Sequence, residues 1–227
     1  MVAVMSLPIE RLAALFALAY VGLRVGLIAF TTNGPDPTLP PADEMARAVS
    51  EGTAMRASAL LGFAASIAFS GFAACLALML LRRGDPRGAA LTALAGGLVA
   101  AIDAVSAAAL ITAVEAADRD LGAGVFAAFG DLHTAALLFE LPAVGFVLLL
   151  AWRIHFGRIV SWLGVVVGLG CVLAAGAAIR DFDQVHRAGG PFGFAVVLWF
   201  IGLPIWLIVT SIVLLRRGGR LASSAAR

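Results

Sequence analysis

Four ionisable residues lie inside long apolar stretches of the sequence, where a charge is costly unless it has a partner or a function. Arg24 stands in VGLRVG, Asp103 in AIDAVSAAA, and His133 and Glu140 in GDLHTAALLFELP. Such groups can hold helices together, bind or carry a polar ligand or protons, or act as general acid and base. We therefore take all four as candidate ligand-binding residues. If the protein is an enzyme, Asp103 and Glu140 are the catalytic candidates.

The composition places these residues in a bilayer. Of the 227 residues 62% are hydrophobic and 13% charged, and the mean hydropathy is +1.01, which excludes a water-soluble globule. All 16 basic residues are Arg, so chemistry built on a lysine Schiff base is excluded. Cys75 and Cys171 are far apart and form no CxxC motif, which gives thiol redox chemistry little support.

Uninterrupted apolar runs of roughly 20 residues predict membrane-spanning helices. Strands would need alternating polarity, which these runs lack. The fold class expected is all-α, a polytopic membrane protein consisting of a six-helix bundle in a single transmembrane domain over residues 1–227. The six predicted spans are Leu12–Phe30, Ala57–Leu81, Gly88–Val114, Leu132–Trp152, Ile159–Ile179 and Phe192–Leu215.

The arginines predict the orientation of this bundle. If the six spans are correct, one side carries ten of them: Arg11, Arg82, Arg83, Arg87, Arg153, Arg158, Arg216, Arg217, Arg220 and Arg227. The other side carries five, together with most of the acids. The positive-inside rule then puts both termini in the cytoplasm. The longest connection becomes extracytoplasmic, and within it residues 42–52 are expected to form a short helix on the membrane surface.

Three of the buried charged residues are expected at a similar depth in the membrane. Arg24 and Glu140 each lie 13 residues from the nearest cytoplasmic arginine, about 20 Å at 1.5 Å per residue, and Asp103 lies at about 24 Å. We expect Arg24 to contact Glu140, Asp103 or both. His133, two turns from Glu140 on the same helical face, is expected at the outer mouth of a cavity that opens to the extracytoplasmic side.

Small residues at helical spacing predict close helix packing, as in Gly22 with Gly26 and Gly164 with Gly168. Pro142 and Pro204 each remove an intrahelical hydrogen bond near the charged layer. We interpret Trp199 and Trp206 as packing or lipid-facing aromatics and not as a cage for a cation ligand.

No motif indicates a metal or cofactor. His133, His186, Asp131, Asp181 and Asp183 have no metal-ligand spacing, and His155 and His186 fall in predicted loops, away from the mid-span position of haem ligands. We therefore expect neither metal nor cofactor. The net charge of +2 and the scattered arginines argue against nucleic acid as a partner.

Several segments resemble a known family. These are RLAALFALAYVGL, AVSEGTAMRASALLGFAASIAFSGFAACLALMLL and GDLHTAALLFELPAVGFVLLLAWRIHFGRIVSWLGVVVGLG. They are similar to an uncharacterised bacterial multi-pass membrane-protein family, the domain of unknown function 4386 family. The resemblance implies a six-helix fold in the bacterial inner membrane and supplies no activity. Arg24 and Glu140 inside the spans depart from the family pattern.

Three functions remain open from the sequence. The first is a polar intramembrane site, open to the extracytoplasmic side, that binds or transports a small amphipathic or cationic ligand through Arg24, Asp103, His133 and Glu140. The second is a membrane-embedded enzyme that acts on a lipid or isoprenoid substrate by carboxylate acid/base catalysis. The third is a structural or partner subunit whose buried ion pairs only hold helices together. The partners expected are membrane lipid and a small-molecule or lipid ligand, and the oligomeric state is open.

Overall fold

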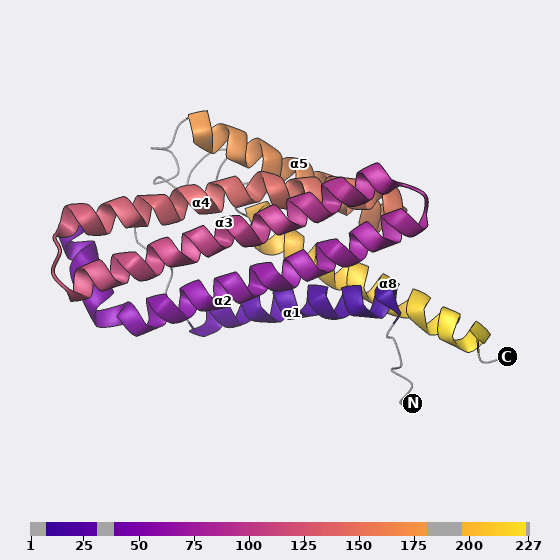
Figure 1. The fold of residues 1–227 in the computed structure, drawn as a ribbon, viewed down its shortest axis with the longest axis horizontal. Coiled ribbons are helices and arrows are strands. Elements are labelled where there is room, and N and C mark those ends of the chain that lie inside the picture. Colours follow the sequence, from indigo (N-terminus) through magenta and orange to yellow (C-terminus); the bar gives the residue numbers. More distant parts are fainter. Residues whose placement is uncertain (1–7, 31–38, 181–196, 226–227) are drawn as a thin grey trace.

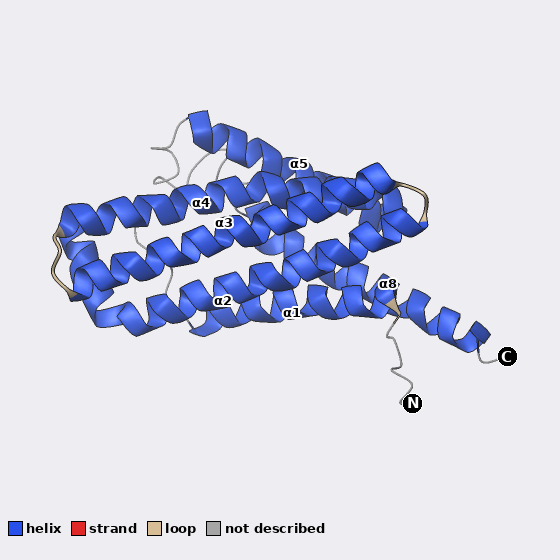
Figure 2. Cartoon of the chain, in the orientation of Figure 1, coloured by secondary structure: helices blue, strands red, loops and turns tan. Residues whose placement is uncertain are grey.

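The computed structural model describes residues 8–30, 39–180 and 197–225. All regular structure in these ranges is helical (Figure 2). The elements are α1 (Ile9–Phe30), α2 (Pro41–Arg82), α3 (Pro86–Asp118), α4 (Ala123–Ala151), η1 (Trp152–Ile154), α5 (Arg158–Arg180), η2 (Leu198–Gly202) and α8 (Leu203–Ala225). η1 is a 3₁₀ turn and η2 a π-helical turn.

The helices form a bundle of neighbours in chain order (Figure 1). α2 packs against α1 and α3, α4 against α3 and α5, and α8 closes the bundle against α1. Among the described residues, five helical segments are long and apolar enough to cross a membrane: 41–82, 86–118, 123–154, 158–176 and 199–218. The fold is thus a helical bundle of the multi-pass membrane type, and α1 as a sixth span stays a prediction.

The expectation of a short surface helix before the second span is wrong. Residues 42–52 do not form a separate surface helix, because α2 runs without a break from Pro41 to Arg82. Arg47 joins Glu44 and Glu51 on the same helix, with N–O distances of 2.6 and 2.9 Å, and side chains spaced this way favour the helical conformation. Gly52 packs against the Val114 side chain of α3, so the segment belongs to the bundle.

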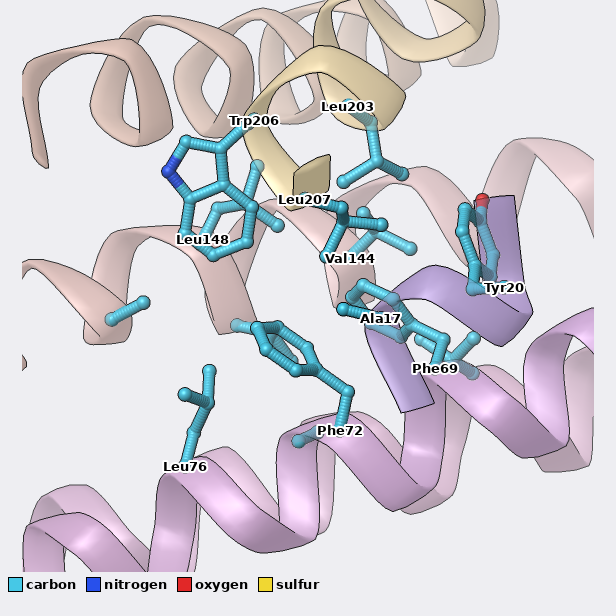
Figure 3. Packing of buried hydrophobic residues seen from close by; sticks show 14 of the residues in the cluster. Ala17, Tyr20, Phe69, Phe72, Leu76, Val144, Leu148, Leu203, Trp206 and Leu207 are labelled. Carbon is cyan, nitrogen blue, oxygen red and sulfur yellow. The ribbon is translucent and has the colours of Figure 1, made fainter. Parts of the chain in front are cut away.

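The core contains aromatic residues from α1, α2 and α8 (Figure 3). Tyr20 of α1 packs on Phe69 of α2 at 5.5 Å between ring centroids, and Phe72 meets Trp206 of α8 at 5.9 Å. The Trp206 indole N–H donates to the Val160 carbonyl of α5 at 3.0 Å. Buried tryptophan and tyrosine side chains bury a large apolar surface, and their N–H or O–H group usually forms a hydrogen bond.

Only part of the predicted small-residue packing is observed. Gly168 and Gly145 bring α5 and α4 together, since a methyl group added at Gly145 would lie 2.6 Å from the Gly168 carbonyl oxygen. Gly22 and Gly26 make no such approach: no described atom lies within 4 Å of a methyl group added at either one. The prediction is wrong for this pair because the exposed side of α1 carries Gly22.

One end of the bundle collects arginines. Arg82, Arg83 and Arg217 meet there around a hollow that also touches Glu10. The start of α1, the end of α2 and the course of α8 reach this same end in Figure 1. This clustering agrees with the arginine asymmetry read from the sequence, and which side of a membrane it faces stays a prediction.

Candidate ligand-binding site

Arg24 occupies the centre of the candidate site. Its Nη2 atom lies 3.5 Å from Glu140 Oε1 of α4, and its Nε donates to the Tyr20 hydroxyl at 3.2 Å. The guanidinium carbon lies 4.7 Å from the centre of the Trp199 ring and 5.4 Å from that of Tyr20. One cation from α1 is therefore held by a carboxylate and two aromatic rings.

Glu140 is the most enclosed of the predicted site residues. Its side chain is 0% exposed, and neither carboxylate oxygen has a hydrogen-bond partner among the described residues. Its one ion pair with a described residue is the 3.5 Å contact with Arg24. Pro142 follows two residues later inside α4. An unpaired carboxylate at this burial would cost several kcal/mol, so the arginine is what permits a charge here.

Asp103 of α3 has a different environment. It is 4% exposed, and its Oδ2 accepts a hydrogen bond from the Ser66 hydroxyl of α2. It forms no ion pair with a described basic side chain within 4.0 Å. Gly62, one turn before Ser66, leaves space beside the carboxylate, because a methyl group added there would lie 4.0 Å from Oδ2. The carboxylate is thus buried and hydrogen-bonded to a neutral donor, and no described basic side chain lies within ion-pairing distance of it.

His133 connects α4 to α3. Its Nδ1 lies 2.7 Å from the Ser106 hydroxyl oxygen and 3.0 Å from the Ser106 carbonyl oxygen. In the tautomer that carries its proton on Nδ1, this atom donates to the carbonyl oxygen and Nε2 is a hydrogen-bond acceptor. Ser106 is almost fully buried and His133 half-buried. The pair fixes the orientation of the imidazole at one edge of the site.

Three of the four candidate ligand-binding residues line one small cavity. It has a volume of about 140 Å³. Arg24, Asp103 and His133 all line it, whereas Glu140 does not and reaches it only through Arg24. The other lining residues are Leu27, Ser58, Ala59, Gly62, Ser106, Ala107, Leu110, Leu137, Trp199 and Phe200. At ~30 Å³ per water molecule, the space holds roughly four or five waters or a ligand of similar size.

The charges around this cavity do not balance. Arg24 and Glu140 compensate each other in an ion pair, which leaves the Asp103 carboxylate as a net negative charge at the cavity wall. Apolar side chains form much of the remaining wall, and they strengthen electrostatic interactions inside it by excluding water. The arrangement is suited to a cation or to a group that donates hydrogen bonds.

Sequence reasoning missed the aromatic and hydroxyl partners. Trp199 and Trp206 are both buried in the core, which confirms their interpretation as packing aromatics. The contact of the Trp199 ring with the Arg24 guanidinium was not predicted. Ser66 could have been found, since it belongs to the small-residue row Gly62, Ser66 and Ser70 on α2. Nothing in the sequence singles out Tyr20 as the partner of the arginine one turn later.

A larger hollow lies elsewhere in the described structure, and no charged side chain lines it. It is an apolar groove of about 770 Å³ along α3 and α4, lined by residues such as Leu94, Leu98 and Phe146. A surface of this kind fits lipid chains. It offers no group for acid, base or polar recognition.

Metal binding finds no support in the part of the chain that the structure describes. That part contains no group of three or more His, Cys, Asp or Glu side chains placed to hold an ion. Asp131 is exposed near the start of α4. His186, Asp181 and Asp183 lie outside the described residues.

The site and the fold together define the class as an all-helical multi-pass bundle with charged residues in its interior. Comparison with protein-family models, curated proteins and solved structures finds no match to this chain. The family resemblance read from the sequence segments therefore stays a prediction.

Proposed function

We propose that the protein is an integral membrane protein that binds or transports a small cationic ligand, or the cationic end of an amphipathic one, in the cavity beside Asp103. The observation that carries this proposal is the buried Asp103 carboxylate at the cavity wall, which has a hydroxyl partner and no described basic partner. A carboxylate in such surroundings is stabilised by a bound cation or by protonation.

Arg24 and Glu140 have a supporting role in this proposal. The Glu140 carboxylate offsets the charge of the Arg24 guanidinium, which weakens the repulsion between Arg24 and a cation bound at Asp103. The pair as a whole is electrically neutral, and Arg24 forms part of the cavity wall. The cavity volume of about 140 Å³ limits the part of the ligand that enters it to a few non-hydrogen atoms.

His133 and Ser106 set the edge of the cavity. The imidazole keeps Nε2 free to accept a hydrogen bond when Nδ1 is held by Ser106. An acceptor beside a carboxylate suits a primary or secondary ammonium group, which has several N–H donors. The bacterial inner membrane and an extracytoplasmic opening are part of this proposal and rest on the sequence.

The test is cation binding to purified protein in detergent. Ammonium, methylammonium, tetramethylammonium and guanidinium chlorides are titrated against the melting temperature, with sodium chloride as the ionic-strength control. We expect a saturable rise with at least one organic cation, and loss of that rise in Asp103→Asn, which keeps the shape and removes the charge. Asp131→Asn, an exposed acid outside the cavity, should retain it. An equal response in wild type and Asp103→Asn refutes the proposal.

A further inference from the structure

A second pocket lies at the arginine-rich end of the bundle, apart from the cavity beside Asp103. Its volume is about 370 Å³, within the range of small-molecule sites in proteins. Three guanidinium groups contribute to it: Arg82 and Arg83 at the end of α2, and Arg217 from α8. Residues from both ends of the chain thus form one basic pocket.

The three arginines have no acidic partner. Neither Arg82, Arg83 nor Arg217 forms an ion pair with any acid in the ranges 8–30, 39–180 and 197–225. The neighbouring Arg153 is different, because it pairs with Asp85 at 3.1 Å. Three arginines that have no ion pair with a described acid therefore meet in one pocket.

One of the guanidinium groups is held in place. Arg217 Nη2 donates to the His155 carbonyl at 2.7 Å, and its guanidinium carbon lies 5.9 Å from the centre of the Phe156 ring. A guanidinium has five N–H donors, so several remain for a ligand. Arg83 is held more weakly, by a 3.4 Å contact with the Arg153 carbonyl.

The rest of the lining is apolar apart from one acid. Met79, Ile154 and Leu214 are buried and form the apolar part of the wall. Glu10 of α1 also lines the pocket. With three arginines and one glutamate, the formal charge of the lining is +2. The pocket therefore combines a net positive charge with an apolar floor.

We propose that this pocket binds a phosphate-bearing anion. The planar guanidinium matches two phosphate oxygens at once, and clustered arginines are the usual protein partner of phosphate. Basic pockets between membrane helices also receive the headgroups of anionic lipids. The apolar floor suits the glycerol and upper acyl carbons of a phospholipid, whereas a soluble phosphate would use the arginines alone.

This inference is independent of the proposed cation site, because the two lie on different residues and take ligands of opposite charge. The probes are dioctanoyl phosphatidylglycerol, dioctanoyl phosphatidylcholine and inorganic phosphate, each added to purified full-length protein in a non-ionic detergent. Lipid adducts are counted by native mass spectrometry, and the melting temperature is measured in parallel.

Two triple variants separate a built pocket from general surface charge. The pocket variant carries Arg82→Gln, Arg83→Gln and Arg217→Gln. The matched control carries Arg87→Gln, Arg158→Gln and Arg216→Gln, which removes the same charge from exposed residues that do not line the pocket. Each variant must first show a cooperative melt without added lipid. Arg217→Lys serves as a milder variant that keeps the charge.

In wild type and the control variant, we expect phosphatidylglycerol to bind and raise the melting temperature more than phosphatidylcholine does. Affinity should fall about tenfold or more in the pocket variant, because the charge-assisted hydrogen bonds from three guanidinium groups are lost. If inorganic phosphate reproduces the effect, the ligand is a soluble phosphate; if it does not, the ligand is the lipid headgroup. Equal binding of both lipids with no effect of phosphate, or equal losses in the two triple variants, overturns the proposal. If the pocket triple does not fold, Arg217→Lys decides by the same criterion: unchanged affinity for the anionic probe overturns the proposal.

Discussion

The ion pair between Arg24 and Glu140 should show strong energetic coupling. Arg24→Met leaves the Glu140 carboxylate without its partner, and removing one member of a buried pair costs about 3–5 kcal/mol. It also removes the contact with the Trp199 ring, 4.7 Å from the guanidinium carbon, which is worth roughly 1–2 kcal/mol when desolvated. Glu140→Gln leaves a buried cation without a counter-ion and should cost about 3 kcal/mol.

The double variant Arg24→Met with Glu140→Gln removes both charges together. Its remaining cost is the lost aromatic contact and imperfect packing, roughly 2 kcal/mol. The double variant should therefore lose less stability than the sum of the losses in the two single variants. The difference, the coupling free energy, should be at least about 2 kcal/mol. The assay is reversible unfolding in mixed micelles titrated with sodium dodecyl sulfate, followed by circular dichroism.

The control cycle uses an exposed ion pair on the same protein. Arg56 and Glu115 join α2 and α3 at 2.9 Å, and both side chains are partly exposed. Their coupling should stay under about 1 kcal/mol. If Arg24 and Glu140 behave additively to within about 0.5 kcal/mol, as independent sites do, the two residues do not share a buried charge interaction and the description of the site is wrong.

Two further changes test the packing around the site. Gly164→Ala places a methyl group 2.6 Å from the Trp206 indole nitrogen and should destabilise the fold by roughly 1–3 kcal/mol. Gly176→Ala is the control, because no described atom lies within 4 Å of the added methyl group. It should be nearly neutral in the same unfolding assay. Ser66→Ala removes the hydroxyl donor to Asp103 and should lower the free energy of unfolding by about 1–3 kcal/mol. It should also change the response of the melting temperature to added cations. A serine with a purely structural role would leave that response unaltered.

The sequence correctly predicted an all-helical fold with several long apolar helices, five of which lie among the described residues. It was a poor guide to where the helices end. Hydrophobic runs mark the part of a helix that suits hydrocarbon, and the hydrogen-bonded helix continues past it. α4 begins at Ala123, nine residues before the predicted span at Leu132, and α2 begins sixteen residues before Ala57. Polar residues such as Arg47 extend these helices through contacts within the helix.

The depth of the buried charges was predictable because the rise per helical residue is constant. The predicted contact between Arg24 and Glu140 is confirmed. Which acid pairs with the arginine was not predictable, because that depends on how each helix is rotated about its axis. Packing sets this rotation, and it left Glu140 sealed and Asp103 at the cavity wall.

The π-helical turn explains why two tryptophans on one segment have different roles. Trp199 and Trp206 are seven residues apart, which puts them on nearly the same face of a regular α-helix. Pro204 has no N–H for the Phe200 carbonyl, and the chain widens into η2 at residues 198–202 just before it. A π-helical turn has more residues than an α-helical turn, so the seven-residue spacing no longer puts Trp199 and Trp206 on one face. Trp206 accordingly packs on Gly164 of α5 while Trp199 reaches Arg24 of α1. The aromatic wall of the cavity thus follows from a proline five residues later, and π-helical turns of this kind are common at functional sites.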